Sequence, residues 1–160
     1  MKAFISYTRE KDAYDHVVSS FRDRLETELK LRKRSSAVFM DKSAIAAGMS
    51  FPAEIDKALA NADVLIVLLS PAWLESEWCR RELEHFVEFK SNRGRFPAVL
   101  PLLWVTVDLD RYHRDKLAAF LSPIQYRDWR DLRKRRWSTY ALRNEMDKLA
   151  DALFALAKIK

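Results

Sequence analysis

Residues 63 to 70 read Asp-Val-Leu-Ile-Val-Leu-Leu-Ser, an apolar run of six residues between two polar ones. Valine, isoleucine and leucine over this length are typical of a buried strand. A strand without polar alternation is expected where helices cover both faces of a sheet, as in parallel α/β proteins. The run therefore predicts a central strand of a parallel sheet.

Similar short runs recur along the chain, separated by helical patterns. The other predicted strands are Ala3 to Tyr7, Ala37 to Met40, Val99 to Val105 and, more weakly, Ile124 to Tyr126. Apolar residues at helical spacing predict helices over residues 12–32, 51–60, 72–91 and 136–157. Because crossovers between parallel strands are right-handed, we expect a doubly wound α/β sandwich with five strands in the order 2-1-3-4-5. No repeat or linker interrupts this alternation, so residues 1–160 are predicted to form a single domain.

Composition excludes several classes of protein. Gly48 and Gly94 are the only glycines in 160 residues, too few for the glycine-rich phosphate loops of Rossmann dehydrogenases and P-loop nucleotidases. Cys79 is the only cysteine and the three histidines lack metal-ligand spacing, so we expect no metal and no cofactor. No apolar run is long enough to span a bilayer, and the start does not resemble a signal peptide. We therefore expect a soluble cytoplasmic protein without a membrane partner.

Ligands of doubly wound sheets bind beyond the carboxyl ends of the strands. One segment expected there carries Trp78, Glu82 and Phe86 at successive spacings of four, which places a carboxylate between two aromatic residues on one line of a helix. Alternatively, Glu82 lies at the helix edge in water or pairs with a distant arginine. In the same helix, Cys79 is interpreted as a small buried residue, and His85 as a solvent-facing or capping residue rather than a proton relay.

Five motifs stand out in the chain: Phe4-Ile-Ser-Tyr7, Val38-Phe-Met-Asp41, the loop from Ile45 through Gly48 to Phe51, Leu68-Leu-Ser-Pro71, and Ser76-Glu-Trp-Cys-Arg-Arg-Glu-Leu83. Together they resemble the motifs of a TIR (Toll/interleukin-1 receptor) domain, most closely the bacterial, enzymatic branch of that family. They cover about residues 2 to 105 in the family's order. The resemblance implies a flavodoxin-like fold.

The same resemblance implies one of two functions. In the first, the chain is an NAD+ glycohydrolase or ADP-ribosyl cyclase that cleaves the nicotinamide-ribose bond, with NAD+ as substrate. Self-assembly with other TIR domains into a homo-oligomer or filament would activate it, in bacterial immune signalling or antiviral defence, with a fused or separate sensor domain as partner. The alternative is a non-catalytic adaptor module that only binds other TIR domains.

For the enzymatic reading, the resemblance makes Glu82 the catalytic residue, four places after the aromatic Trp78. Arg9 is the candidate phosphate contact, and Thr8 departs from the family pattern, because relatives often carry arginine at that position. Ser70 is also a candidate helix cap, the role we favour. The resemblance assigns substrate binding to Trp78, Tyr7, Thr8, Arg9, Phe39, Asp41, Ile45, Gly48 and Ser70, and docking of a neighbouring TIR domain to the loop residues Ala46, Ala47, Gly48, Met49 and Phe51. From the residues alone, Gly48 is equally compatible with a plain turn.

Between Arg127 and Arg143 stand seven Lys and Arg residues against two Asp, whereas the whole chain carries a net charge of +6. Aromatic residues interleave with these cations, as on surfaces that bind single-stranded nucleic acid. The favoured alternative is a solvated segment whose Trp129, Trp137 and Tyr140 pack a helix on the sheet. Nucleic acid is therefore not an expected partner.

Overall fold

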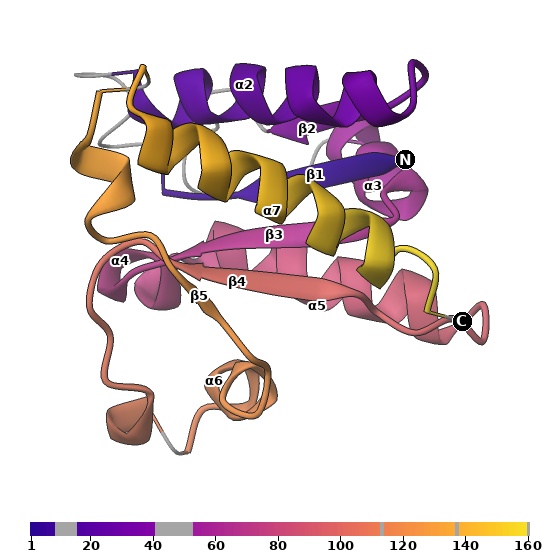
Figure 1. Cartoon of the computed structure of the whole chain (residues 1–160). Coiled ribbons are helices and arrows are strands. Elements are labelled where there is room, and N and C mark those ends of the chain that lie inside the picture. Colours follow the sequence, from indigo (N-terminus) through magenta and orange to yellow (C-terminus); the bar gives the residue numbers. More distant parts are fainter. Residues whose placement is uncertain (9–15, 41–52, 113, 137, 160) are drawn as a thin grey trace.

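The structure is a computed structural model that describes residues 1–8, 16–40, 53–112, 114–136 and 138–159 (Figure 1). Its sheet has five strands, all parallel, in the order β2-β1-β3-β4-β5. The strands are β1 (Lys2–Ser6), β2 (Ala37–Met40), β3 (Val64–Leu69), β4 (Val99–Leu103) and β5 (Arg127–Asp128). This confirms the predicted doubly wound, flavodoxin-like fold and its strand order.

The stretch that predicts the fold lies at the centre of the sheet. All six residues of β3 are buried, and Ile66 is in register with Ile5 of β1 on one side and Leu100 of β4 on the other. Helices cover both faces, so neither face of this strand meets water. Polar and apolar residues do not alternate in β3 because helices bury both of its faces.

Helices α2 (Val17–Arg32) and α7 (Tyr140–Leu156) lie side by side over one face of the sheet (Figure 1). On the other face lie α3 (Ala53–Asn61), α4 (Pro71–Glu75), α5 (Glu77–Ser91) and α6 (Lys116–Leu121). We call these the α2/α7 face and the α3/α5 face. Two short 3-10 helices, Leu109–Tyr112 and Leu132–Lys134, complete the regular elements of the described ranges.

Side chains of β1 alternate between these two faces. Ala3, Ile5 and Tyr7 join the core under α2 and α7, whereas Phe4 joins the core under α3 and α5. Ser6, which comes between Ile5 and Tyr7, is fully buried and contacts residues of α4 and α5. The C-terminal end of β1 therefore presents a hydroxyl group to the α3/α5 face.

Phe21 of α2 is the centre of an aromatic cluster under the α2/α7 face. Its ring meets Trp104 edge-on at 5.6 Å and Trp129 edge-on at 5.1 Å, and the two indoles stack at 6.5 Å. Trp129 follows β5 directly and is 1% exposed. The cluster confirms that Trp129 packs against the sheet, but Tyr140 is 78% exposed, so that part of the prediction is wrong.

The predicted helix over 72–91 is two helices. Ser76 interrupts it because its backbone is extended, and its side-chain oxygen accepts a hydrogen bond from the Cys79 backbone N–H at 3.3 Å. Ser76 is thus the N-cap that starts α5, and Ser70 caps α4 in the same way. Two serines at such positions are a capping signal that helical periodicity alone does not register.

Other boundaries also differ from the predictions. The fifth strand is Arg127–Asp128 rather than Ile124 to Tyr126, and α7 begins at Tyr140 rather than at residue 136. Helix α6 was not predicted; it is one and a half turns long, and Asp115 caps it. The helix predicted over 12–32 begins at Val17, after His16 as its N-cap, and residues 12–15 lie outside the described ranges. In the parts of the chain that the structure describes, no helix combines the length and apolar character needed to cross a membrane.

Candidate active site

Glu82 lies on the buried side of α5, at the carboxyl edge of the sheet. It is 2% exposed, and its Oε2 accepts a hydrogen bond of 2.5 Å from Oγ of Ser6. Buried glutamates are uncommon and need polar partners, since an isolated carboxylate in an apolar interior is costly. The alternative that places Glu82 at the helix edge in water is therefore wrong.

Ser6 also bonds to a third residue, Trp73 of α4. The indole Nε1–H of Trp73 donates to Ser6 Oγ at 3.0 Å, and both side chains are fully buried. Trp73 is held in place at its backbone, because its N–H donates to the capping Oγ of Ser70 at 3.1 Å. A continuous hydrogen-bonded row therefore runs from Trp73 through Ser6 to Glu82.

Helix α5 is fixed around Glu82 by further polar contacts. One turn before the carboxylate, Cys79 Sγ lies 3.4 Å from the Tyr7 carbonyl oxygen, to which it donates a weak hydrogen bond. Next to it, Arg80 pairs with Asp115, the N-cap of α6, at 2.7 Å. This hydrogen bond from Arg80, together with backbone N–H donors at the cap, holds the pKa of Asp115 below its ordinary value. Cys79 is a buried residue as predicted.

His85 was predicted to face solvent or to cap the helix; its side chain is partly exposed but also bonds to a neighbouring helix. Its Nδ1 is 2.7 Å from Oδ1 of Asp56 on α3, and both side chains are about one-third exposed. The histidine ring also meets Phe89 edge-on at 6.3 Å. His85 therefore links α5 to α3, at a position one turn beyond Glu82.

The predicted aromatic row along α5 is partly buried in the core. Phe86 is fully buried, with the Lys90 ammonium 5.3 Å from its ring centroid, and Trp78 packs at the edge of the α3/α5 core, half-buried. The carboxylate of Glu82 between them is hydrogen-bonded to Ser6. Of the two aromatic residues, Trp78 is the one with surface that a substrate could contact.

The Tyr7 side chain and Glu82 lie on opposite faces of the sheet, and substrate binding by Tyr7 stays a prediction. Alternation along β1 turns its side chain to the α2/α7 face, where it is 8% exposed, whereas Ser6 and Glu82 lie on the opposite face. Tyr7, Thr8 and Ser70 line a hollow of about 210 Å³ at the carboxyl ends of β1 and β3, together with Trp104 and with Pro71 and Ala72 of α4. Ser70 serves as the helix cap, the role favoured from the sequence.

Phe39 lies on β2 at the edge of the sheet and is 38% exposed. It is in register with Phe4, and its neighbour Val38 faces the α2/α7 core, so Phe39 belongs to the same face of the sheet as Glu82. The other predicted positions lie outside the described residues, and their roles stay predictions. They are Arg9, Asp41, Ile45, Ala46, Ala47, Gly48, Met49 and Phe51.

Ser6 and Trp73 were not among the predicted site residues. The signal for Ser6 is that it is the one polar residue within the run from Ala3 to Tyr7, because a polar group in a buried strand must find a hydrogen-bond partner. Trp73 gives no comparable signal. Its role follows only from the position of α4 against the end of β1.

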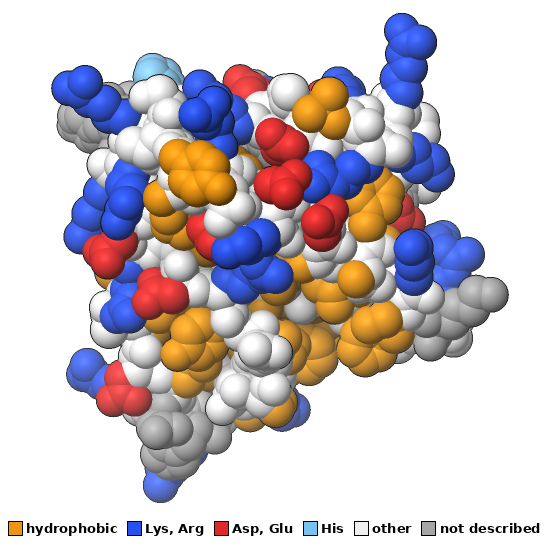
Figure 2. All heavy atoms as spheres, viewed as in Figure 1, with side chains coloured by type: hydrophobic (Ala, Val, Ile, Leu, Met, Phe, Trp, Pro, Cys, Tyr) orange, Lys and Arg blue, Asp and Glu red, His pale blue; other side chains and the backbone are white. Residues whose placement is uncertain are grey.

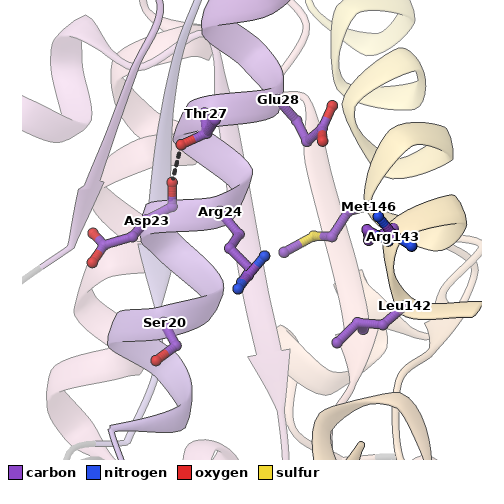
Figure 3. Close-up of a pocket in the computed structure, with 8 residues that line it drawn as sticks. All are labelled: Ser20, Asp23, Arg24, Thr27, Glu28, Leu142, Arg143 and Met146. Atoms are coloured by element: carbon purple, nitrogen blue, oxygen red, sulfur yellow. Dashed lines mark hydrogen bonds between the residues drawn. The ribbon is translucent and has the colours of Figure 1, made fainter. Parts of the chain in front are cut away.

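A larger hollow, of about 450 Å³, lies between α2 and α7 (Figure 3). Its lining mixes both signs of charge, including Arg24 and Arg143 with Asp23 and Glu28. Because it lies on the α2/α7 face, the sheet separates it from Glu82. It is therefore no part of the candidate active site.

Charged side chains of both signs are interspersed over α2 and α7 (Figure 2). Within the basic stretch from Arg127 to Arg143, Arg130 pairs with Asp128 at 2.6 Å, and this contact lowers the pKa of Asp128 to about 2. Trp137 lies outside the described residues.

No group of three or more His, Cys, Asp or Glu side chains that could hold a metal ion is found among the residues that the structure describes.

Comparisons with known proteins agree with this architecture. The TIR domain family model matches residues 3–149. A curated relative, the NAD(+) hydrolase ApTIR of Actinoplanes sp. (strain ATCC 31044 / CBS 674.73 / SE50/110), is 31% identical over 116 residues, which cover 68% of this chain but only 16% of that protein.

Two solved structures share the fold. The TIR domains of the activated Roq1 resistosome, which directly recognises the pathogen effector XopQ, superpose with a TM-score of 0.50 at 20% identity, over 99% of this chain and 84% of theirs. The TIR domain of the Toll-related receptor TRR-2 of Hydra magnipapillata gives a TM-score of 0.50 at 19% identity, over 90% of this chain and 96% of its own. With the family model matching nearly the whole sequence, the chain belongs to the TIR domain family.

Proposed function

We propose that this TIR domain cleaves the nicotinamide-ribose bond of NAD+, with Glu82 as its catalytic carboxylate. The observation that carries the proposal is a glutamate buried at the carboxyl edge of the sheet and hydrogen-bonded to the end of β1. Ligands of doubly wound folds bind at this edge. A relative described as an NAD(+) hydrolase supports the choice of substrate.

The chemistry needs one anion rather than a pair of carboxyl groups. As the C1′–N bond breaks, its electron pair returns to the pyridinium nitrogen, and nicotinamide leaves neutral without a general acid. The ribose is left with positive charge spread over C1′ and the ring oxygen, and a nearby carboxylate stabilises that charge. Attack of water at C1′ and loss of a proton complete hydrolysis to ADP-ribose, and attack from within the molecule gives a cyclised product.

Substrate contacts follow from what lies near Glu82. Trp78 stands one turn before the carboxylate and would stack on the nicotinamide ring, and Phe39 would contact the substrate from the edge strand on the same face. By the family resemblance, the loop around Gly48 would frame the NAD+ pocket and dock a neighbouring TIR domain. Activity would then depend on assembly, with a role in immune signalling or defence and a sensor domain, fused or separate, as the trigger.

The test is the release of nicotinamide from NAD+ by the wild-type chain, by Glu82→Gln and by the matched control Glu84→Gln. Glu84 lies on the same helix but is exposed, so its amide variant controls for charge and helix propensity. We expect turnover per molecule to rise with protein concentration, and only Glu82→Gln to abolish it. No turnover at any concentration, including under crowding, would instead favour the non-catalytic adaptor.

A further inference from the structure

We infer that Ser6 and Trp73 form a buried hydrogen-bond relay that holds the Glu82 side chain in one orientation, which makes them positioning residues for the proposed reaction. The catalytic part of this inference rests on the proposed function, whereas the relay itself does not. Its three members come from α4, β1 and α5, which meet at the carboxyl edge of the sheet.

The direction of the relay follows from which groups can donate. An indole Nε1–H only donates, so Ser6 Oγ is the acceptor of the 3.0 Å contact from Trp73. The serine hydroxyl then has one proton to place, and Glu82 Oε2 lies 2.5 Å away. Glu82 Oε2 accepts this proton, so the indole, the hydroxyl and the carboxyl group form one row in which every donor faces an acceptor.

Burial makes this arrangement costly to break. Ser6 and Trp73 are fully buried and Glu82 is 2% exposed, so a donor or acceptor that loses its partner here has little access to replacement water. Hydrogen bonds to charged groups are also the stronger ones. Glu82 is therefore held at Oε2 by a hydroxyl that is itself oriented by a fixed indole.

The backbone around the relay is fixed as well. Ser70 caps α4 through the Trp73 N–H at 3.1 Å, which sets the indole. Cys79 bonds to the Tyr7 carbonyl at 3.4 Å, one turn before Glu82, which sets α5 against the end of β1. Each member of the relay belongs to an element that is held in place by its own contacts. The position of the Glu82 carboxyl group is therefore fixed relative to the end of β1.

The kinetic test uses three variants. Ser6→Ala removes the hydroxyl, Ser6→Thr keeps it, and Trp73→Phe keeps an aromatic ring but removes the Nε1–H. We expect Ser6→Ala to lower kcat by about ten- to a hundredfold with KM changed by less than about threefold, because the carboxylate acts on charge that develops in the transition state. Ser6→Thr should recover most of the rate, and Trp73→Phe should lose about three- to tenfold.

A second readout does not depend on activity. Five tryptophans give five indole N–H signals in a ¹⁵N-¹H correlation spectrum, and Trp73→Phe identifies the one from Trp73. We expect Glu82→Gln to shift this signal in the wild-type background, because an amide changes what Ser6 Oγ accepts and donates. The same substitution should leave the Trp73 signal unmoved in the Ser6→Ala background.

These readouts separate the relay from the proposed function. A Trp73 signal that ignores Glu82→Gln, or that responds equally with and without Ser6, overturns the relay whether or not the protein is active. Turnover that requires Glu82 but is unchanged in a folded Ser6→Ala protein overturns the positioning role alone. A wild-type protein without turnover defeats the proposed function, while the spectrum still decides the relay. Near-ultraviolet circular dichroism confirms that each variant is folded.

Discussion

Asp115 joins the helix that carries Glu82 to α6, and its removal measures how strongly that helix is anchored. Its Oδ1 caps α6 by accepting the backbone N–H of Leu117 at 2.9 Å and of Ala118 at 3.1 Å. Its Oδ2 pairs with Arg80 of α5 at 2.7 Å. The two functions can be separated, because asparagine also caps helices but carries no charge.

The magnitudes follow from exposure. The Arg80 and Asp115 side chains are 28% and 24% exposed, so their ion pair belongs near the upper end of surface pairs, about 1 kcal/mol. Loss of an N-cap costs about 1 kcal/mol more. Asp115→Asn should therefore destabilise by about 1 kcal/mol and Asp115→Ala by about 2 kcal/mol, which correspond to about 3 °C and 6 °C in Tm for a chain of this size.

The effect should also depend on pH. The Arg80 hydrogen bond lowers the pKa of Asp115 below its ordinary value of 3.8, so the folded state binds this proton less readily than the unfolded state. The resulting stabilisation is fully present above about pH 4 to 5 and is lost as the pH falls through the lowered pKa. The gap between wild type and Asp115→Asn should accordingly close during acidification.

Urea unfolding of the three proteins at pH 7 and at pH 3, followed by circular dichroism, checks this prediction. If Asp115→Asn and Asp115→Ala lose the same stability at pH 7, the cap contributes nothing. A gap between wild type and Asp115→Asn that persists undiminished at pH 3 would contradict the ion pair as its source.

Three further predictions concern stability. Burial lowers the pKa of Lys90, so its charge opposes folding at pH 7. Lys90→Met should therefore raise the midpoint of urea unfolding. The difference in midpoint between variant and wild type should shrink as the pH approaches 10.5, where the unfolded lysine also loses its charge. Phe21→Ala, which empties the centre of the aromatic cluster, should cost about 3 to 5 kcal/mol by urea unfolding, and a cost below about 1 kcal/mol would refute that packing. The contact with Arg130 lowers the pKa of Asp128 to about 2, but both side chains are about half exposed. Asp128→Asn should therefore change the Tm by less than about 2 °C at pH 7. A larger loss of Tm by calorimetry would contradict the use of exposure to predict the strength of this ion pair.

The fold could be predicted because its signals are local and repeated. A strand such as Val64–Leu69 reads as buried on both sides, and the handedness of crossovers then leaves few strand orders. The errors lie where a single side chain overrides a periodic pattern. Ser76 splits one helical pattern into two helices through one hydrogen bond, and Asp115 starts a helix too short for periodicity to register.

The candidate site was predictable only at its centre. Glu82 stands out in the sequence because it interrupts an aromatic row, and the structure places it in the interior at the expected edge of the sheet. Its partner Ser6 is 76 positions away, and Trp73, which bonds to Ser6, is 67 positions from Ser6; sequence spacing does not encode which side chains meet across such separations. Adjacent strand residues face opposite sides of a sheet, so the Tyr7 side chain lies on the face opposite to Glu82, and its role in substrate binding stays a prediction.

The most direct test of the central claim is the ratio of nicotinamide release rates from NAD+ between Glu82→Gln and Glu84→Gln, measured at equal and high protein concentration with products identified by mass spectrometry. Removal of the carboxylate that opposes the charge on ribose should slow the reaction at least about a hundredfold, whereas the exposed control should keep the wild-type rate. Equal rates of nicotinamide and ADP-ribose formation by the two variants would contradict Glu82 as the catalytic group.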